Sequence, residues 1–249
     1  DVSLSNRDRY IALNGKVSNS EKDTLMVDIK DFDLSYLFSI VNFHAVDFHG
    51  FATGRIYGRQ LTKAPLADAF LQVHDFTFND ADMGDMDMHI NWGSHPKTIL
   101  LDAYIQEPRA HQQTTVLGSI TLGHDPGSGI DLNINTQRMD LHFLHRYASS
   151  IFDKMEGRIS GNCRVFGAFK NINLQGTVVA EEASVRVSSL GVDYHLAGDT
   201  VILTPDTIRF PSATIYDYLG APGYNEHSAQ LSGMLTHHHL THMSYDVNI

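Results

Sequence analysis

The sequence has little of several features that mark familiar functional classes. With one cysteine in 249 residues, no disulfide can form within the chain. Lys and Arg number 18 against 29 Asp and Glu, and the net charge of −11 repels a phosphate backbone. No apolar run reaches the roughly 18 residues that a membrane-spanning helix needs. We therefore expect neither a nucleic-acid partner nor a membrane-spanning helix within this sequence.

Catalytic motifs are also missing. The sequence contains no Gly-x-Ser-x-Gly, Gly-x-Gly-x-x-Gly or Gly-x-x-x-x-Gly-Lys-Ser/Thr, and Gly127-Ser128-Gly129 is a turn that follows Pro126. Glu181 and Glu182 are adjacent, so in a regular strand they point to opposite faces and cannot share acid–base work. We expect a protein that has no catalytic residues and no cofactor, and that is therefore not an enzyme.

Fifteen histidines and a run of aspartates resemble metal sites, but neither pattern is complete. His237 and His239 share one face of a strand, with His242 nearby, and a carboxylate or water could complete a tetrahedral zinc site. We favour the simpler interpretation, in which these histidines occupy half-exposed strand and turn positions. The run 80–87 differs from a calcium loop because Gly84 comes one position early and Asn91 occupies the twelfth position. We expect no metal.

The single cysteine, Cys163, lies in the alternating run 161–165. No base that would activate its thiol can be identified nearby. We therefore interpret Cys163 as a small hydrophobic residue of the core.

What the sequence has in abundance is alternation of apolar and polar residues. The runs 86–92, 172–178 and 242–249 are typical of strands with one buried face. Turn residues recur about every 8–12 residues, a spacing that predicts antiparallel strands. The segments 34–41 and 141–148 predict short helices, which Asp33 and Asp140 would cap. We predict an all-β fold with one or two short helices.

An internal repeat with an offset of 107 residues relates the two halves. Residues 32–37 match 139–144, and residues 50–55 match 157–162. Two tandem domains would give such a repeat, and so would consecutive units of one elongated sheet. We favour the sheet, because alternation continues through the middle of the chain without a flexible linker. The prediction is one continuous sheet over 1–249, with repeat units at about 25–130 and 131–249.

A sheet with one long apolar face must cover that face with something. Packing the face against itself would give a closed sandwich, whereas an open, curved sheet would leave a groove suited to acyl chains. Sequence alone leaves both alternatives open. From the residues of one parity in each strand, we predict that the groove is lined by Ile159, Cys163, Val165, Ile172, Leu174, Val178, Val185, Val187, Val201, Leu203, Ile208, Phe210, Leu231, Leu235, Tyr245 and Val247.

The second half of the chain resembles the TamB-like translocation and assembly module proteins of Bacteroidetes-type bacteria. The order and spacing of its glycines and alternating strands carry this resemblance, over the segments 157–167, 173–176, 183–187, 199–210 and 229–249. The chain departs from the family at 217–227, where a longer loop replaces a tight turn.

The resemblance implies a curved, groove-like or taco-like sheet, related to AsmA-like and bridge-like lipid-transfer proteins. It further implies a periplasmic protein of outer-membrane biogenesis, anchored in the inner membrane by a segment absent here. Its expected ligand is a phospholipid or another acyl-chain ligand, and its expected partner is an outer-membrane assembly protein of the Omp85 type. The chain begins at Asp1 without a signal peptide or initiator Met, so we expect it to belong to a longer protein.

An alternative function follows from the closed arrangement. A β-sandwich or solenoid with a sealed apolar face would act as a structural or protein-interaction module of the cell envelope. In either arrangement, an elongated sheet cut at both ends exposes strand edges, and we expect the isolated chain to dimerise edge to edge.

Overall fold

The computed structural model describes residues 2–6, 8–36, 47–95, 97–123, 125–149, 152–189, 191–196, 198–216, 228–238 and 241–248. Within these ranges the chain is almost entirely strand. The strands are β1 (Val2–Asn6), β2 (Arg9–Gly15), β3 (Thr24–Asp33), β4 (Phe48–Arg59), β5 (Leu66–Phe78), β6 (Ala81–His95), β7 (Thr98–Glu107), β8 (Gln112–Thr121), β9 (Gly129–Asp140), β10 (Phe152–Ala168), β11 (Asn171–Val187), β12 (Val192–Leu196), β13 (Asp199–Leu203), β14 (Thr207–Tyr216), β15 (Ser228–His238) and β16 (Thr241–Asn248).

Helical structure is confined to short connections. Two of them are the 3-10 turn η1 (Pro108–Ala110) and the pair formed by η2 (Leu141–Leu144) and α2 (His145–Ala148). Residues 34–36 are also helical, whereas the rest of the predicted helix 34–41 lies outside the described residues. The predicted helix 141–148 is confirmed as the η2–α2 pair. The predicted caps are confirmed too, because Asp33 Oδ1 accepts the N–H of Ser35 and Asp140 Oδ1 accepts that of His142, both at 2.9 Å.

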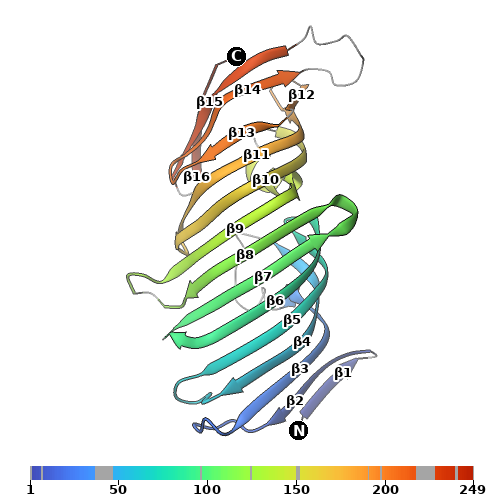
Figure 1. The fold of residues 1–249 in the computed structure, drawn as a ribbon, viewed down its shortest axis with the longest axis vertical. Coiled ribbons are helices and arrows are strands. Elements are labelled where there is room, and N and C mark those ends of the chain that lie inside the picture. The colour runs from blue at the N-terminus through green and yellow to red at the C-terminus, as the bar shows by residue number, and fades with distance from the viewer. Residues whose placement is uncertain are drawn as a thin grey trace.

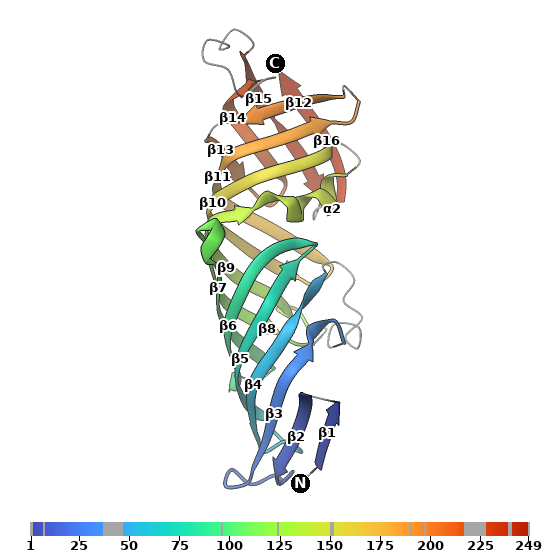
Figure 2. The ribbon, with the colours of Figure 1, turned by 90° about the vertical axis from the view of Figure 1, so that its right-hand side faces the viewer.

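The strands form one antiparallel meander (Figure 1). Each strand pairs with the next along the chain, except that the short strands β12 and β13 lie end to end and both pair with β11 and β14. The predicted all-β, antiparallel fold with short helices is therefore confirmed. Figure 2 shows the resulting ribbon from the side, with the N- and C-terminal strands at opposite ends of its long axis.

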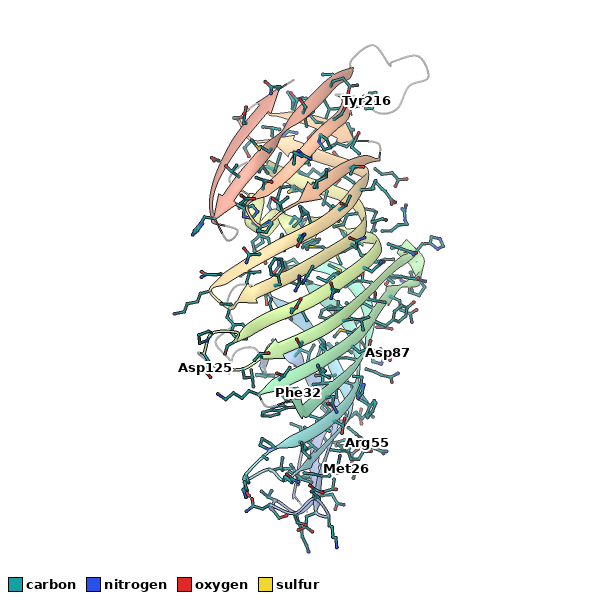
Figure 3. All side chains as sticks on the ribbon, turned by 60° about the vertical axis from the view of Figure 1, so that its left-hand side comes forward. Met26, Phe32, Arg55, Asp87, Asp125 and Tyr216 are labelled. Atoms are coloured by element: carbon teal, nitrogen blue, oxygen red, sulfur yellow. The ribbon has the colours of Figure 1, made fainter. Side chains whose placement is uncertain are left out.

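The ladder register separates the sheet into two chemically different faces. One row of directly paired positions crosses the sheet from β2 to β16 and holds only apolar residues and glycine: Ile11, Ile29, Gly54, Leu71, Met88, Ala103, Val116, Ile134, Cys163, Gly176, Leu203, Ile208, Leu235 and Tyr245. The opposite face carries the charged side chains of the strands, among them Arg55 and Asp87 (Figure 3), together with exposed Phe70, Leu100 and Leu117. There Arg55 pairs with Asp28, and Arg164 pairs with Asp131, both at 2.7 Å.

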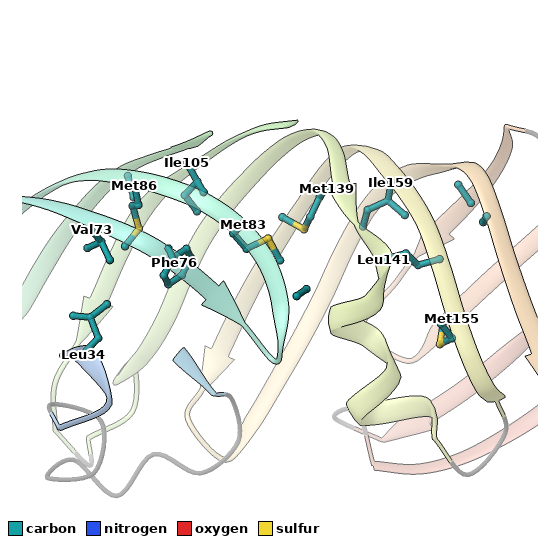
Figure 4. Packing of buried hydrophobic residues seen from close by; sticks show 14 of the residues in the cluster. Leu34, Val73, Phe76, Met83, Met86, Ile105, Met139, Leu141, Met155 and Ile159 are labelled. Atoms are coloured by element: carbon teal, nitrogen blue, oxygen red, sulfur yellow. The ribbon is translucent and has the colours of Figure 1, made fainter. Parts of the chain in front are cut away.

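The best-packed part of the molecule lies near one edge of the sheet, which we call the helix edge. The connections that contain 34–36, η1, η2 and α2 all lie at this edge. In Figure 4 the strands arch over the buried cluster, and Leu34 and Leu141 lie on the same side of the sheet as Val73 and Met86. The opposite edge, which we call the loop edge, carries the connections β2–β3, β4–β5, β6–β7, β8–β9 and β10–β11.

Local geometry recurs at the offset of 107 residues. Asp31 and Arg138 both adopt a left-handed conformation, with φ of 50° and 55°. In each case the backbone N–H donates to a hydroxyl on the following strand, to Thr53 Oγ1 at 3.1 Å and to Ser160 Oγ at 2.9 Å. Both residues lie in a register shift just before a helical connection. The boundaries of the repeat units, about 25–130 and 131–249, stay a prediction.

Candidate functional site

The candidate site is the face that carries the row Ile11 to Tyr245, which we call the apolar face. Parallel rows flank it on both sides. Towards the helix edge lies the helix-side row, Phe32, Ala52, Val73, Met86, Ile105, Thr114, Thr136, Gly161, Val178 and Val201. At the other margin lies the loop-side row, Gly15, Leu25, Gly58, Ala67, Trp92, Ile99, Ile120, Ile130, Gly167 and Ile172.

Burial differs between these two rows. In the helix-side row, Ala52 and Val73 are 0% exposed and Ile105 is 7% exposed. In the loop-side row, Trp92 and Ile172 are only half-buried, as are the other large side chains of that row. The difference arises because the helical connections pack against the helix edge and no described residue covers the loop side to the same extent. The apolar face is thus a core at one margin and accessible to solvent at the other.

The polar residues within the helix-side row satisfy each other. Thr114 and Thr136 are 1% and 5% exposed, and their hydroxyls form a hydrogen bond of 2.6 Å. A buried hydroxyl without a partner would be costly, and this pair avoids that cost while adding no charge to the face. The helix-side row is therefore a core without a charged group, and its two buried hydroxyls are paired with each other.

The register brings all sixteen predicted lining positions onto the apolar face. Val165 pairs with Leu174, Val178 with Val201, and Ile208 with Leu235. Ile159, Val178 and Val201 are buried by the protein itself, and eleven others are half-buried: Cys163, Val165, Ile172, Leu174, Val185, Val187, Leu203, Ile208, Phe210, Leu231 and Leu235. Tyr245 and Val247 pair through their backbones with Leu235 and Gly233, and the structure describes only the backbone of these two residues. Contact of these residues with a ligand stays a prediction.

Sequence reasoning missed the first half of the same face. The rows continue without a break through β2 to β9, with Val27, Ile56 and Leu101 in positions equivalent to Val165 and Leu174. The signal was present, because the same alternation occurs in both halves.

Cys163 lies in the middle of the apolar face, between Ile134 and Gly176 in the ladder. It is half-buried and forms no disulfide. Burial raises the pKa of its thiol, so the neutral form is favoured at neutral pH. Its surroundings agree with the interpretation of Cys163 as a small hydrophobic residue.

The predicted separation of Glu181 and Glu182 is wrong. Both carboxylates contact the guanidinium of Arg138, at 3.3 Å and 3.6 Å. Glu182 has φ of 49° and lies in a register shift of β11, so the strict alternation of a regular strand does not apply there. The two carboxylates are held by one cation rather than poised for acid–base chemistry.

The two patterns that resembled metal sites fall in strands and turns. Residues 80–87 form the β5–β6 turn and the start of β6. His237 is buried in β15, while His239 lies outside the described residues. Among the residues that are described, no three His, Cys, Asp or Glu side chains are grouped as metal ligands would be. Within the same residues, no helix is both long enough and apolar enough to cross a membrane.

Comparison with known proteins adds no relative. No family model, no curated protein and no solved structure matches the chain. The resemblance to TamB-like proteins therefore stays a prediction from the sequence.

Proposed function

We propose that this chain is a non-catalytic segment of an envelope-biogenesis protein whose apolar face forms a groove that carries phospholipid acyl chains. The observation that carries the proposal is the unbroken apolar face across β2–β16, buried at the helix edge and accessible at the loop edge. The large side chains of the loop-side row are only half-buried, and an apolar face that the protein leaves partly uncovered is typical of a binding surface. The opposite face carries ion pairs such as Arg55–Asp28 and Arg164–Asp131, and we take it to be the face in contact with water.

The mechanism we propose is passive. Each buried CH₂ contributes about 0.8 kcal/mol, so an acyl chain on this face gains affinity from its length rather than from one specific contact. Successive strands present similar apolar residues in the same row, and a chain can therefore shift from one strand to the next at little cost. No covalent step and no cofactor is required.

The biological setting follows the TamB-like resemblance. In it the protein lies in the periplasm, is anchored in the inner membrane by a segment outside this sequence, and moves phospholipid towards the outer membrane. Assistance to outer-membrane protein assembly, with a partner of the Omp85 type, belongs to the same proposal. Cross-linking in the envelope of the source bacterium would identify the partner.

The alternative is a closed sandwich or solenoid that serves as a structural or interaction module. The half-buried large side chains of the loop-side row favour the open arrangement, because a sheet folded onto itself would bury them as fully as Val73 of the helix-side row.

Substitution of Leu174 by aspartate separates the two functions. Leu174 is half-buried on the apolar face, so in an open groove L174D leaves the sheet folded and weakens lipid uptake roughly tenfold or more. Uptake is measured with a fluorescent phospholipid, and folding by circular dichroism. In a closed module the same charge would be buried, and the protein would unfold.

The matched control is Leu100→Asp, because Leu100 is 37% exposed on the opposite face and pairs with the neutral residues Asn91 and Ser119. It introduces the same charge, and we expect unchanged folding and unchanged uptake. Native mass spectrometry of the wild-type protein provides an independent readout. If the wild type carries no co-purified lipid and takes up no fluorescent phospholipid, the proposal is wrong.

A further inference from the structure

Exposed carboxamide side chains are grouped on the face opposite the apolar face, over β8–β11. The register brings residues 113–119 of β8 against 131–137 of β9, and these against 162–166 of β10 and 173–177 of β11. The strand spacing makes this area about 14 Å wide across the four strands, and it is of similar length along them. Its exposed amides, which we call the amide patch, are Gln113, Asn133, Asn135, Gln137, Asn162 and Gln175.

The amide patch offers hydrogen bonding without net charge. None of its six side chains forms a hydrogen bond to another group among the residues that the structure describes, and each carboxamide has two N–H donors and an acceptor oxygen. The charged residues of the four segments are Arg164 and Asp131, which bond to each other at 2.7 Å and 2.8 Å. A protein with a net charge of −11 thus presents a neutral polar surface here.

A pocket lies at one end of the amide patch, beside η1. Its volume of about 340 Å³ is in the range of small-molecule sites. Gln113 and Gln137 belong to both the patch and the pocket, and they are paired directly across β8 and β9. The residues that line the pocket include no Asp, Glu, Lys or Arg; they are Gln106, Pro108, His111, Gln112, Gln113 and Gln137.

One side chain of the pocket is held rigidly by the core. Gln112 is 1% exposed, and its Nε2 donates to the carbonyl oxygen of Met83 at 3.2 Å. Its Oε1 accepts the backbone N–H of Asp140 at 3.1 Å. The buried amide therefore fixes one wall of the pocket, while the exposed glutamines opposite it keep their donors and acceptors for a ligand.

The chemistry of the pocket and the amide patch indicates the class of ligand. Each hydroxyl of a sugar donates one hydrogen bond and accepts others, and a carboxamide matches both roles. Leu117 is 48% exposed beside Asn133 and can contact the apolar C–H face of a sugar ring. A charged ligand would find no free opposite charge in the patch, and the net charge of the protein disfavours an anion.

We propose that the pocket and the amide patch bind a neutral glycan, with one end of the glycan in the pocket beside η1 and its chain crossing β8–β11. The site lies on the face opposite the proposed lipid groove. The inference therefore goes beyond the lipid-carrying function and does not depend on it.

Isothermal titration calorimetry of the whole chain tests the ligand class. The probes are three neutral hexasaccharides, cellohexaose, maltohexaose and chitohexaose, together with the anionic hexagalacturonate. We expect at least one neutral probe to bind with a Kd below about 1 mM, and hexagalacturonate to bind at least about tenfold more weakly than that probe. If none of the three neutral probes binds, or if hexagalacturonate binds as tightly as they do, the proposal is overturned.

Two double variants test the location of the site. Q113A/Q137A removes amides from the pocket, and N135A/N162A removes amides from the middle of the patch. The matched control is N14A/Q230A, because these two amides are exposed on the same face outside the patch. One neutral hydrogen bond accounts for about fivefold in affinity, so we expect at least that loss in each of the first two variants and none in the control.

Each other outcome contradicts a definite part of the proposal. Unchanged affinity in Q113A/Q137A, or an equal loss in N14A/Q230A, excludes this site. A loss in Q113A/Q137A without one in N135A/N162A confines the sugar to the pocket and refutes the path across β8–β11. Circular dichroism checks that each variant is folded. Uptake of a fluorescent phospholipid is expected to stay unchanged in all three variants, which separates a failure of the glycan site from a failure of the lipid-carrying function.

Discussion

The gradient of burial across the apolar face can be measured with one chemical change at two positions. Val73 and Val165 both lie on this face, but Val73 is 0% exposed near the helix edge and Val165 is half-buried towards the loop edge. Val73 packs between Ala52 and Met86, and a Cβ added at Gly50 would lie 2.7 Å from its Cγ1. Replacing each valine with alanine therefore removes the same atoms from a closed environment and from an open one.

The expected loss of stability differs between the two variants. Valine to alanine removes two buried carbons from position 73, which is worth about 1.6 kcal/mol in transfer free energy, and the cavity left behind raises the total to about 2–3 kcal/mol. At position 165 part of the side chain already contacts water, so we expect a loss below about 1 kcal/mol. The lower strand propensity of alanine contributes to both variants and cancels in the difference.

Urea unfolding followed by far-UV circular dichroism measures both values, with the slope on denaturant compared to check that each variant unfolds as the wild type does. A difference of at least about 1 kcal/mol is expected. Equal losses would refute the reasoning, because they would mean that the apolar face is buried uniformly. Equal losses near 3 kcal/mol would further support the closed module over the open groove.

Two further predictions concern single interactions. Arg164 forms two hydrogen bonds to Asp131, at 2.7 Å and 2.8 Å, and lowers the pKa of that carboxyl. In Arg164→Ala we expect the pKa of Asp131, measured by carboxyl ¹³C NMR, to rise towards its ordinary value. Because the pKa of Asp131 is lowered in the folded protein, the ionised carboxylate stabilises the fold at pH values above its ordinary pKa. This contribution should be lost as the pH falls through the lowered pKa of the wild type. An unchanged pKa of Asp131 in Arg164→Ala would contradict the assignment of the lowered pKa to Arg164. Asp140→Ala removes the cap of η2 and should cost about 1 kcal/mol in urea unfolding, whereas Asp140→Ser should keep most of it; equal losses in the two variants would assign the role of Asp140 to its contact with Arg158 instead.

Local sequence signals predicted much of the fold correctly. The alternation of runs such as 172–178 places Ile172 and Leu174 on one face whatever the neighbouring strand is, because side chains of a strand alternate with a period of two. Asp33 and Asp140 were identified as caps for the same reason, since a cap bonds to an amide two residues away. Predictions of this kind hold only where the local backbone geometry is regular. Glu181 and Glu182 were misassigned because a left-handed residue in β11 interrupts the alternation.

The candidate site was only half predictable. The lining positions of the second half could be named from parity, but their counterparts in β2–β9 were overlooked although the same signal was there.

The sequence by itself determined that alternate residues of each strand form one apolar face, that the strands are antiparallel, and where the helices at 34 and 141 begin. These properties depend on residues a few positions apart. Only the tertiary structure decided which margin of the apolar face is buried, since that depends on where the helical connections pack against strands distant in sequence.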